Sequence, residues 1–209
     1  MKEKEIERLN ILKEEENKLY DSGKINYICG IDEAGRGPLA GPVVVGTVIM
    51  PKDSFIEGVN DSKKISEKKR EKIYEQILEE AISYSVGIVD QNKIDEINIL
   101  NATKLDLKIA IEGLETKPDV IMVDALNNID TCGIPYISVV KGDAKNYCIA
   151  AASIVAKVTR DRIMKEWDEI YPVYGFAKHK GYGTAEHIRI IKETGPCMLH
   201  RKSFIKNFV

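Results

Sequence analysis

The chain has 209 residues, of which 44% are hydrophobic and 31% are charged, a balance typical of a globular protein that folds by burying an apolar core. This composition excludes a disordered chain, a collagen-like repeat and a small disulfide-stapled scaffold. Thirty-one Lys and Arg residues against 33 Asp and Glu residues give a formal net charge of −2, so any contact with a nucleic acid must come from a local basic patch.

The first 24 residues are predicted to be a charged helical appendage to the remaining domain, residues 25–209. Apolar residues recur among alternating acids and bases between Lys2 and Leu19, a pattern typical of a solvated amphipathic helix. The segment lacks the apolar h-region of a signal peptide, and no apolar run reaches the length of a membrane-spanning helix, about 18–20 residues. The four cysteines form no C-x-x-C pair. We therefore expect buried, reduced thiols and a cytoplasmic protein without membrane contact.

The rest of the chain alternates apolar runs with helical patterns. Apolar runs bounded by turn residues predict strands at residues 27–31, 43–50, 84–89, 119–124 and 136–140. The last two are predicted to be fully buried. Helical periodicity predicts one helix from Ser66 and others near 95–114, 146–170 and 184–194. Early strands followed by alternating strands and helices indicate an α/β fold with a mixed sheet.

Acidic side chains stand at the ends of three predicted strands. Asp32 and Glu33 close the first, and Asp124 closes the fourth. Asp143 follows the fifth after a Lys-Gly step. Any one of these acids could be only a helix cap or a turn former, but together they favour a site, because ligands bind beyond the strand ends of α/β sheets. Adjacent strand residues point to opposite faces, so Asp32 and Glu33 can share a ligand only if the strand bends there.

Several carboxylates held within a few ångströms of one another need a counter-charge, because like charges raise each other's pKa. Oxygen ligands without nearby Cys or His favour Mg²⁺ or Mn²⁺ over zinc. Two such ions about 4 Å apart can activate a water molecule and stabilise the leaving oxygen in phosphodiester cleavage. The acids therefore predict a hydrolytic metal site.

A loop rich in glycine and proline follows the first pair of acids. Residues 34–42 (AGRGPLAGP) contain three glycines and two prolines. Glycine lets a ligand approach the main chain, and exposed N–H groups in such a loop suit anionic or hydroxyl-bearing ligands. The loop matches neither the dinucleotide-binding fingerprint nor the P-loop, so its significance comes from the carboxylates beside it.

Residues 30–43 (GIDEAGRGPLAGPV) resemble the N-terminal signature of the bacterial ribonuclease HII family. Further segments resemble motifs of that family in the family's order: 61–64 (DSKK), 123–125 (VDA), 141–143 (KGD), 151–161 (AASIVAKVTRD), 181–184 (GYGT) and 200–204 (HRKSF). The resemblance extends from about residue 27 to residue 204. So many ordered motifs leave little room for chance.

The resemblance implies roles for particular residues. The family's four catalytic, metal-binding carboxylates would be Asp32, Glu33, Asp124 and Asp143. The main chain of Gly35, Arg36 and Gly37 would sense the ribose 2′-OH, which distinguishes RNA from DNA. Tyr182 would stack on the deoxyribose just 3′ of the ribonucleotide. The family's ribonuclease H-like fold, a mixed five-stranded sheet flanked by helices, agrees with the predicted element order. The N-terminal segment is too short for the separate substrate-binding domain of the paralogous ribonuclease HIII.

The implied activity is that of an endoribonuclease that hydrolyses the RNA strand of RNA–DNA hybrids and nicks 5′ of ribonucleotides embedded in duplex DNA, leaving 5′-phosphate and 3′-hydroxyl ends. The expected cofactor is Mg²⁺ or Mn²⁺, with two ions when substrate is bound. A monomer is the default expectation, and a replication or repair protein is a further candidate partner. Two alternatives stay open: a non-catalytic module that binds hybrids, and a DNA-directed nuclease or recombinase of the same fold. The complete set of acids argues against the first, and the loop with Tyr182 argues against the second.

Basic side chains are further candidates for substrate binding. Lys63 and Lys64 follow a turn and could hold phosphates or lie in solvated surface. Lys157 and Arg160 are one helical turn apart, so they could contact a nucleic-acid backbone or pair with Asp161.

The C-terminal stretch is the most basic part of the chain. Residues 178–209 carry seven basic against two acidic side chains, which favours a duplex-binding patch over a merely solvated tail. His179 in this stretch could transfer a proton or serve a structural role.

Overall fold

The centre of the molecule is a mixed sheet of five strands. They are β1 (Ile28–Ala34), β2 (Val43–Ile49), β3 (Ser83–Val89), β4 (Val120–Asp124) and β5 (Tyr136–Val139). Their order across the sheet is β3-β2-β1-β4-β5 in the computed structural model, which describes residues 2–207 and 209. Neighbours among β1, β2 and β3 pair antiparallel, whereas β1, β4 and β5 run parallel. The predicted α/β fold with a mixed five-stranded sheet is confirmed.

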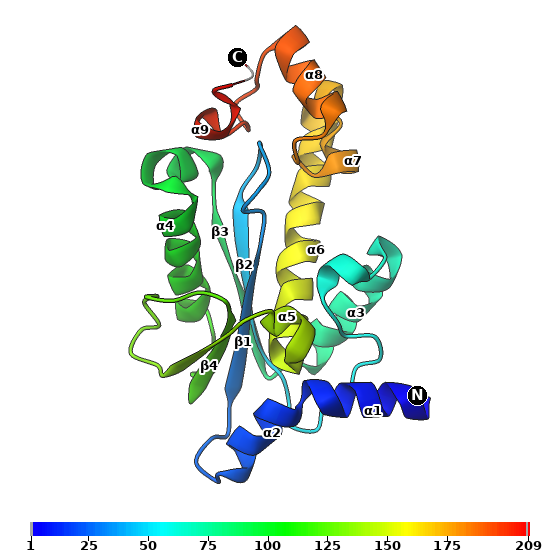
Figure 1. Ribbon diagram of the computed structural model, residues 1–209, viewed down its shortest axis with the longest axis vertical. Helices are drawn as coiled ribbons and strands as arrows, with labels where there is room; N and C mark the ends of the chain where they lie inside the picture. Colours follow the sequence, from blue (N-terminus) through cyan, green and yellow to red (C-terminus); the bar gives the residue numbers. More distant parts are fainter. Residues whose placement is uncertain (1, 208) are drawn as a thin grey trace.

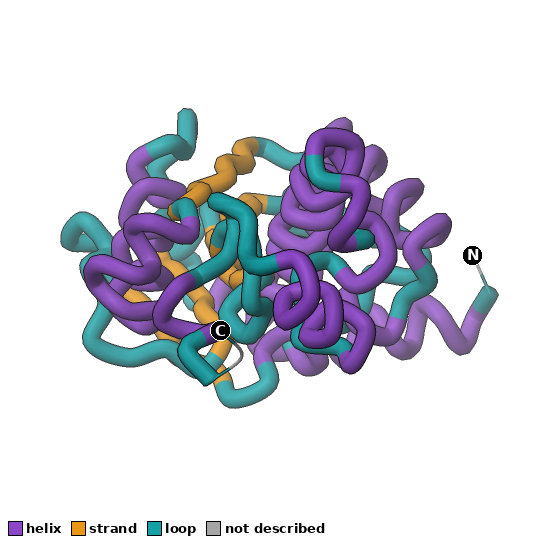
Figure 2. The backbone as a smooth tube through the Cα atoms, turned by 90° about the horizontal axis from the view of Figure 1, so that it is seen from above, coloured by secondary structure: helices purple, strands orange, loops and turns teal. Residues whose placement is uncertain are grey.

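Helices cover both faces of the sheet. In Figures 1 and 2, α4 (Gln91–Glu112) lies against one face, and α6 (Tyr147–Ile170) lies against the other with α3 (Glu67–Glu80) beside it. The shorter helices are α1 (Glu3–Leu12), α2 (Glu14–Asp21), η1 (Ser62–Lys64), α5 (Gly142–Lys145), η2 (Pro172–Tyr174), α7 (Phe176–His179), α8 (Ala185–Thr194) and α9 (Lys202–Ile205). Figure 1 shows α1 and α2 at one end of the molecule and α7, α8 and α9 at the other. None of the described helices is both long and apolar enough to cross a membrane.

Close approach of α6 to the sheet depends on two strand glycines. A Cβ atom on Gly30 of β1 would lie 2.1 Å from the backbone carbonyl of Cys148, and one on Gly46 of β2 would lie 2.6 Å from the carbonyl oxygen of Ala152. Real Cβ atoms do not approach other heavy atoms so closely, because the interior is packed at van der Waals distances. Absence of a side chain at these two positions therefore sets the distance between α6 and the strands β1 and β2, of which β1 carries the first acids.

The N-terminal segment forms two helices, α1 and α2, where one was predicted. Leu9 and Leu12 of α1 are buried in the core that α3 and α6 share. Glu16 of α2 is 3% exposed and accepts a hydrogen bond from the backbone N–H of Cys148 at 2.8 Å. A carboxylate at a helix N-terminus satisfies an unpaired N–H group and opposes the positive end of the helix dipole. The segment is therefore amphipathic, with its buried side chains packed on the domain and tied to the start of α6 and its other face exposed.

The predicted burial of β5 is wrong. Tyr136 and Ile137 are 36% and 38% exposed, because β5 is an edge strand that pairs only with β4. The strand β4, by contrast, is buried up to Val123, as predicted. All four cysteines are free thiols, but only Cys29 and Cys148 are buried, whereas Cys132 is exposed and Cys197 is half-buried, contrary to the expectation that all would be buried.

A buried carboxyl group on α4 gives a prediction about pH. Asp106 is fully buried, and its Oδ1 atom would lie 2.3 Å from a Cβ atom added at Gly87. Burial raises the pKa of Asp106 to about 8. The unfolded chain releases this proton near pH 4, whereas the folded chain keeps it until about pH 8. Between these two values the unfolded state binds fewer protons, so stability falls as pH rises.

Asp106→Asn removes this linkage. We expect the variant to gain stability relative to the parent by up to about 1.4 kcal/mol for each pH unit between about pH 5 and pH 8. Urea-induced unfolding at intervals across this range measures the difference. A difference that stays constant with pH would show that Asp106 is ionised in the folded protein.

Candidate active site

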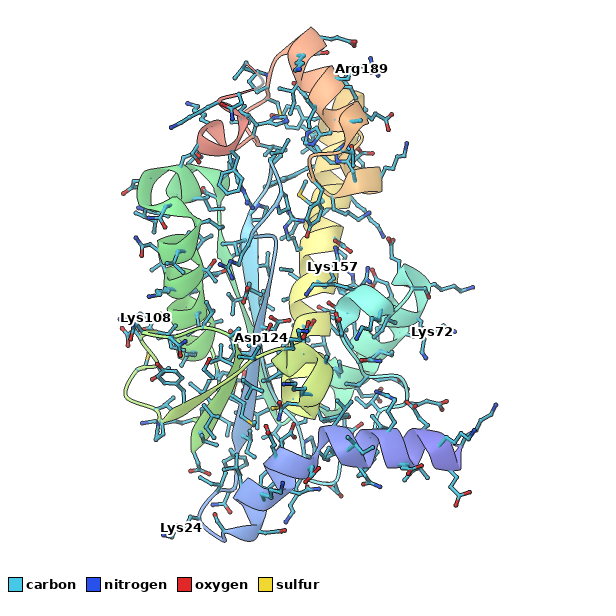
Figure 3. All side chains as sticks on the ribbon, in the orientation of Figure 1. Lys24, Lys72, Lys108, Asp124, Lys157 and Arg189 are labelled. Carbon is cyan, nitrogen blue, oxygen red and sulfur yellow. The ribbon has the colours of Figure 1, made fainter. Side chains whose placement is uncertain are left out.

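The parallel register of β1 and β4 brings acids from distant parts of the sequence together. The two strands pair up to the residues just before Asp32 and Asp124, so these two acids come next to each other at the strand ends. Asp143 reaches the same region on α5, where the preceding Gly142 donates its N–H to Asp124 Oδ1 at 2.7 Å. Figure 3 shows Asp124 near the middle of the molecule, close to α5.

Burial and mutual repulsion raise the pKa values of three carboxyl groups here. Asp32 is 5% exposed, and its pKa is held well above its usual range by burial, by Glu33 and by Asp124. The pKa of Glu33 is raised by burial, against the opposing effect of Arg36. Burial and the nearby Asp143 raise the pKa of Asp124. Raised pKa values show that the negative charge at this place is incompletely compensated.

Three of the carboxylates have a separate donor. Arg36 donates to Glu33 at 3.1 Å, and Lys63 donates to Asp143 at 3.3 Å. Asp124 accepts from the backbone of α5, as described above. With these partners in place, no three acidic, His or Cys side chains of residues 2–207 and 209 converge tightly enough to enclose an ion.

The chemistry of the donor set nevertheless fits a hard divalent cation. All four side chains are carboxylates, and Mg²⁺ and Mn²⁺ prefer oxygen ligands. The pKa values of Asp32, Glu33 and Asp124 are raised by burial first and by neighbouring carboxylates second, and a bound cation would oppose both effects. A bound ion would replace Arg36 and Lys63 as the counter-charge of Glu33 and Asp143.

Two hollows flank the acids. The first, here called the loop cavity, has a volume of about 390 Å³. Its wall includes Glu33, Gly35, Arg36, Gly37, Lys157 and Tyr182. The second hollow measures about 430 Å³, and its wall includes Lys64, Asp124 and Asp143. Lys63 lines both hollows, so Glu33 on one side and Asp124 and Asp143 on the other face adjoining concave surfaces. These surfaces contain every predicted substrate-binding residue except Arg160.

The predicted basic residues have different surroundings. The exposed Lys63 and Lys64 side chains lie near Asp143 and Asp61, at 3.3 and 3.8 Å. Lys157 pairs with Asp161 at 2.7 Å and lies 6.0 Å from the centre of the Tyr182 ring. Lys157 thus forms the expected pair with Asp161. The positions of Lys63 and Lys64 agree both with phosphate binding and with a solvated surface.

Arg160 does not fit the prediction that it binds substrate. Its side chain is fully buried, and it donates to the carbonyl oxygens of Ala40, Pro42 and Lys180. A side chain without exposed surface cannot contact a duplex, so its place is behind the glycine-rich loop.

The C-terminal basic stretch is also less available than predicted. Lys180 and Arg201 are 8% and 0% exposed, so two of its seven bases do not belong to a surface patch. His179 uses both ring nitrogens: Nε2 lies 2.7 Å from the carbonyl oxygen of Tyr174, and Nδ1 accepts from the N–H of Gly181 at 3.1 Å. These contacts favour the structural role of His179.

Two residues beside the site received no role from the sequence. Arg70 of α3 donates to Asp161 at 3.0 Å and to the carbonyl of Ser62 at 2.8 Å, which fixes the turn that carries Lys63. Its spacing from Ile73 and Ile77 on the buried face of α3 was the available signal. Arg201 lies in the family-like segment 200–204, but nothing local to that segment shows which distant backbone it would bind.

Comparisons with known proteins identify the family of this chain. The family model described as Ribonuclease HII matches residues 29–207. A ribonuclease HII of Acetivibrio thermocellus is 56% identical over 207 residues, which are 99% of this chain and 80% of that protein. The ribonuclease H2 structure from Pyrococcus horikoshii OT3 has a TM-score of 0.74 at 28% identity and covers 87% of this chain and 96% of that one. The PCNA:RNase HII complex from Archaeoglobus fulgidus gives 0.70 at 29%, with 84% and 93% covered. The chain therefore belongs to the ribonuclease HII family and is a ribonuclease H, a metal-dependent endonuclease.

Proposed function

We propose that this ribonuclease H hydrolyses the RNA strand of RNA–DNA hybrids and nicks duplex DNA on the 5′ side of an embedded ribonucleotide, leaving 5′-phosphate and 3′-hydroxyl ends. The observation that carries the proposal is the position of the loop cavity, in which Glu33 shares a wall with the main chain of residues 35–37. A ribose bound against that main chain would therefore lie close to the acids.

Asp32, Glu33, Asp124 and Asp143 are proposed to hold two divalent ions, Mg²⁺ or Mn²⁺, when substrate is bound. The ions would supply the positive charge that activates water and stabilises the leaving oxygen. The chain contributes rigidity: Asp32 and Asp124 stand on paired strands, so their carboxylates need little rearrangement as charge develops on the phosphate. Lys63, which lies next to Asp143, would bind the phosphate group whose charge Asp143 would otherwise repel.

Substrate contacts are proposed for the two hollows. Gly35, Arg36 and Gly37 would contact the ribose, and Tyr182, 44% exposed on the cavity wall, would stack on the next sugar. Lys63, Lys64 and Lys157 would bind phosphates of the duplex. Because these contacts are ionic, the affinity for a duplex should fall as salt rises.

We propose that the enzyme acts in the cytoplasm as a monomer and is recruited by a replication or repair protein. The solved Archaeoglobus relative is in complex with PCNA, which supports a PCNA-like replication protein as the first partner to test. Light scattering after size-exclusion chromatography, with and without such a factor, would measure both the oligomeric state and the association.

Cleavage of three labelled duplexes tests the proposed activity: DNA with one ribonucleotide, all-DNA, and an RNA–DNA hybrid, each with Mg²⁺, Mn²⁺ or EDTA. We expect a metal-dependent nick 5′ of the single ribonucleotide, cleavage of the hybrid, and intact all-DNA. Cleavage of all-DNA would contradict recognition of the ribose while leaving the metal site in place. Tight binding without cleavage in any metal would instead favour a binding module.

A further inference from the structure

Two arginines behind the glycine-rich loop are fully buried without an acidic partner. Arg160 of α6 and Arg201, which precedes α9, are both 0% exposed, and within the described residues neither forms a salt bridge. Burial lowers their pKa values to about 10 and about 9, so both remain charged near neutral pH. A buried charge is costly unless other groups compensate it. Here every hydrogen-bond acceptor of the two guanidinium groups is a backbone carbonyl oxygen.

The two guanidinium groups share the carbonyl oxygen of Pro42 but differ in their other partners. Arg201 donates to the carbonyl oxygens of Gly35 at 2.6 Å and Arg36 at 3.0 Å, and further to those of Gly41 and Pro42 at 2.9 and 3.1 Å. Arg160 donates farther along the chain, as described above. Only Arg201 therefore binds the two carbonyls at the start of the loop.

The orientation of these carbonyls determines where the adjacent N–H groups point. All peptide bonds in the described chain are trans, and in a trans peptide the C=O and the following N–H point in opposite directions. The carbonyls of Gly35 and Arg36 face Arg201, so the N–H groups of Arg36 and Gly37 face away from it. Neither N–H has a hydrogen-bond acceptor among the described residues, and both residues line the loop cavity.

The charge of Arg201 also affects the strength of these donors. A carbonyl that accepts from a guanidinium is polarised, and hydrogen bonds in a chain polarise one another. The N–H groups of Arg36 and Gly37 are therefore stronger donors than those of a peptide whose carbonyl faces water. Gly35, with φ +98°, permits the turn, and its missing Cβ leaves room for Arg160 Nε, which would otherwise lie 2.1 Å away.

We infer that Arg201 is a positioning residue that aims the N–H groups of Arg36 and Gly37 at the 2′-hydroxyl of the ribonucleotide and thereby sets the preference for ribose over deoxyribose. This inference rests on the proposed function. Arg201 has no exposed surface and does not itself touch the substrate. Its effect passes through the two carbonyl oxygens that it holds.

The test measures binding preference without cleavage. In an Asp124→Asn background, fluorescence anisotropy compares the affinity for a duplex with one ribonucleotide with that for an all-DNA duplex of the same sequence. Arg201→Lys keeps the charge but loses the planar fork, and Arg201→Gln keeps two donors but loses the charge. We expect each to reduce the preference roughly tenfold, the value of one well-made hydrogen bond, with little change in the affinity for all-DNA.

Two comparisons separate positioning from general destabilisation. Arg160→Lys removes a buried guanidinium from behind the same loop but leaves the hydrogen bonds of Arg201 to the Gly35 and Arg36 carbonyls in place. It should therefore lower the melting temperature as Arg201→Lys does but reduce the preference for the ribonucleotide duplex less. Arg162→Lys, on the surface of α6 beside Glu71, should preserve both. An equal loss of preference in Arg160→Lys and Arg201→Lys would overturn the assignment to Arg201.

The remaining outcomes separate the role of Arg201 from the proposed recognition of the ribonucleotide. A parent protein without any preference for the ribonucleotide duplex overturns the proposed recognition, and the inference with it. A parent that has the preference, together with an Arg201→Lys variant that keeps it, overturns the inference alone. If the Arg201 variants do not fold, amide NMR signals of the parent decide: those of Arg36 and Gly37 should shift with the ribonucleotide duplex and not with all-DNA, and equal shifts with both would refute the inference.

Discussion

Asp124→Asn is expected to lower the rate constant for cleavage by roughly 10³-fold, because loss of one of the proposed carboxylate ligands would remove several kcal/mol of transition-state stabilisation. Asn has nearly the same shape as Asp and retains an oxygen that can accept the 2.7 Å hydrogen bond from the N–H of Gly142. The substitution therefore removes charge while preserving the contact between β4 and α5. Single-turnover cleavage of the ribonucleotide-containing duplex measures the effect.

Duplex affinity should not weaken in the same variant, because a negative charge near the phosphates has been removed. The melting temperature should not fall, since the pKa of Asp124 is raised by burial in the parent. Asp21→Asn is the matched control: its carboxylate is 74% exposed and 3.5 Å from Lys52, and Asp21 lines neither of the two hollows beside the acids. Near-normal turnover of Asp124→Asn at saturating Mg²⁺ would show that Asp124 does not hold the catalytic ion.

Gly30→Ala is expected to lower the free energy of unfolding by about 3 kcal/mol or more, at the upper end of the cost of overpacking. The new Cβ would lie 2.1 Å from the carbonyl carbon and oxygen of Cys148 and 2.6 Å from the N of Ile149. These are backbone atoms of α6, so no side-chain rotation can relieve the contact. The helix must move away from β1, which opens the core and also displaces the strand that carries Asp32.

Urea-induced unfolding compares this variant with Gly23→Ala. Gly23 has φ +69° and nothing within 4 Å of an added Cβ, so Ala there should cost only the backbone strain of a left-handed residue, about 1–2 kcal/mol. An unfolding midpoint of Gly30→Ala equal to or above that of Gly23→Ala would mean that α6 is free to shift on the sheet without loss of packing.

Local patterns predicted the parts of the fold that depend on local causes. Apolar runs of β-branched residues identified β2 and β4, and the acids after such runs identified the strand ends where β1 and β4 meet. The start of α4 was placed four residues late, because Asp90 caps the helix by accepting from the N–H of Lys93 at 2.8 Å. Periodicity finds the apolar positions of a helix and does not find a polar cap before them.

Features decided by distant parts of the chain could not be predicted. The exposure of β5 depends on its place at the edge of the sheet, which an apolar run of four residues does not encode. Arginine side chains such as those of Arg160 and Arg201 are usually exposed at the surface. Only the folded loop supplies the carbonyl oxygens that make their burial tolerable. The same holds for Glu16, whose partner at the start of α6 is 132 residues away.

The bond between Arg201 and the Gly35 carbonyl spans 166 residues, and this separation has a consequence for biosynthesis. A chain leaves the ribosome N-terminus first, so all five strands and α6 emerge before Arg201 does. The core can then assemble while the carbonyls of the loop still lack their guanidinium partner. Recognition of ribose would thus be the last property that the enzyme acquires, and a nascent chain held on the ribosome would carry its acids without the device that selects their substrate.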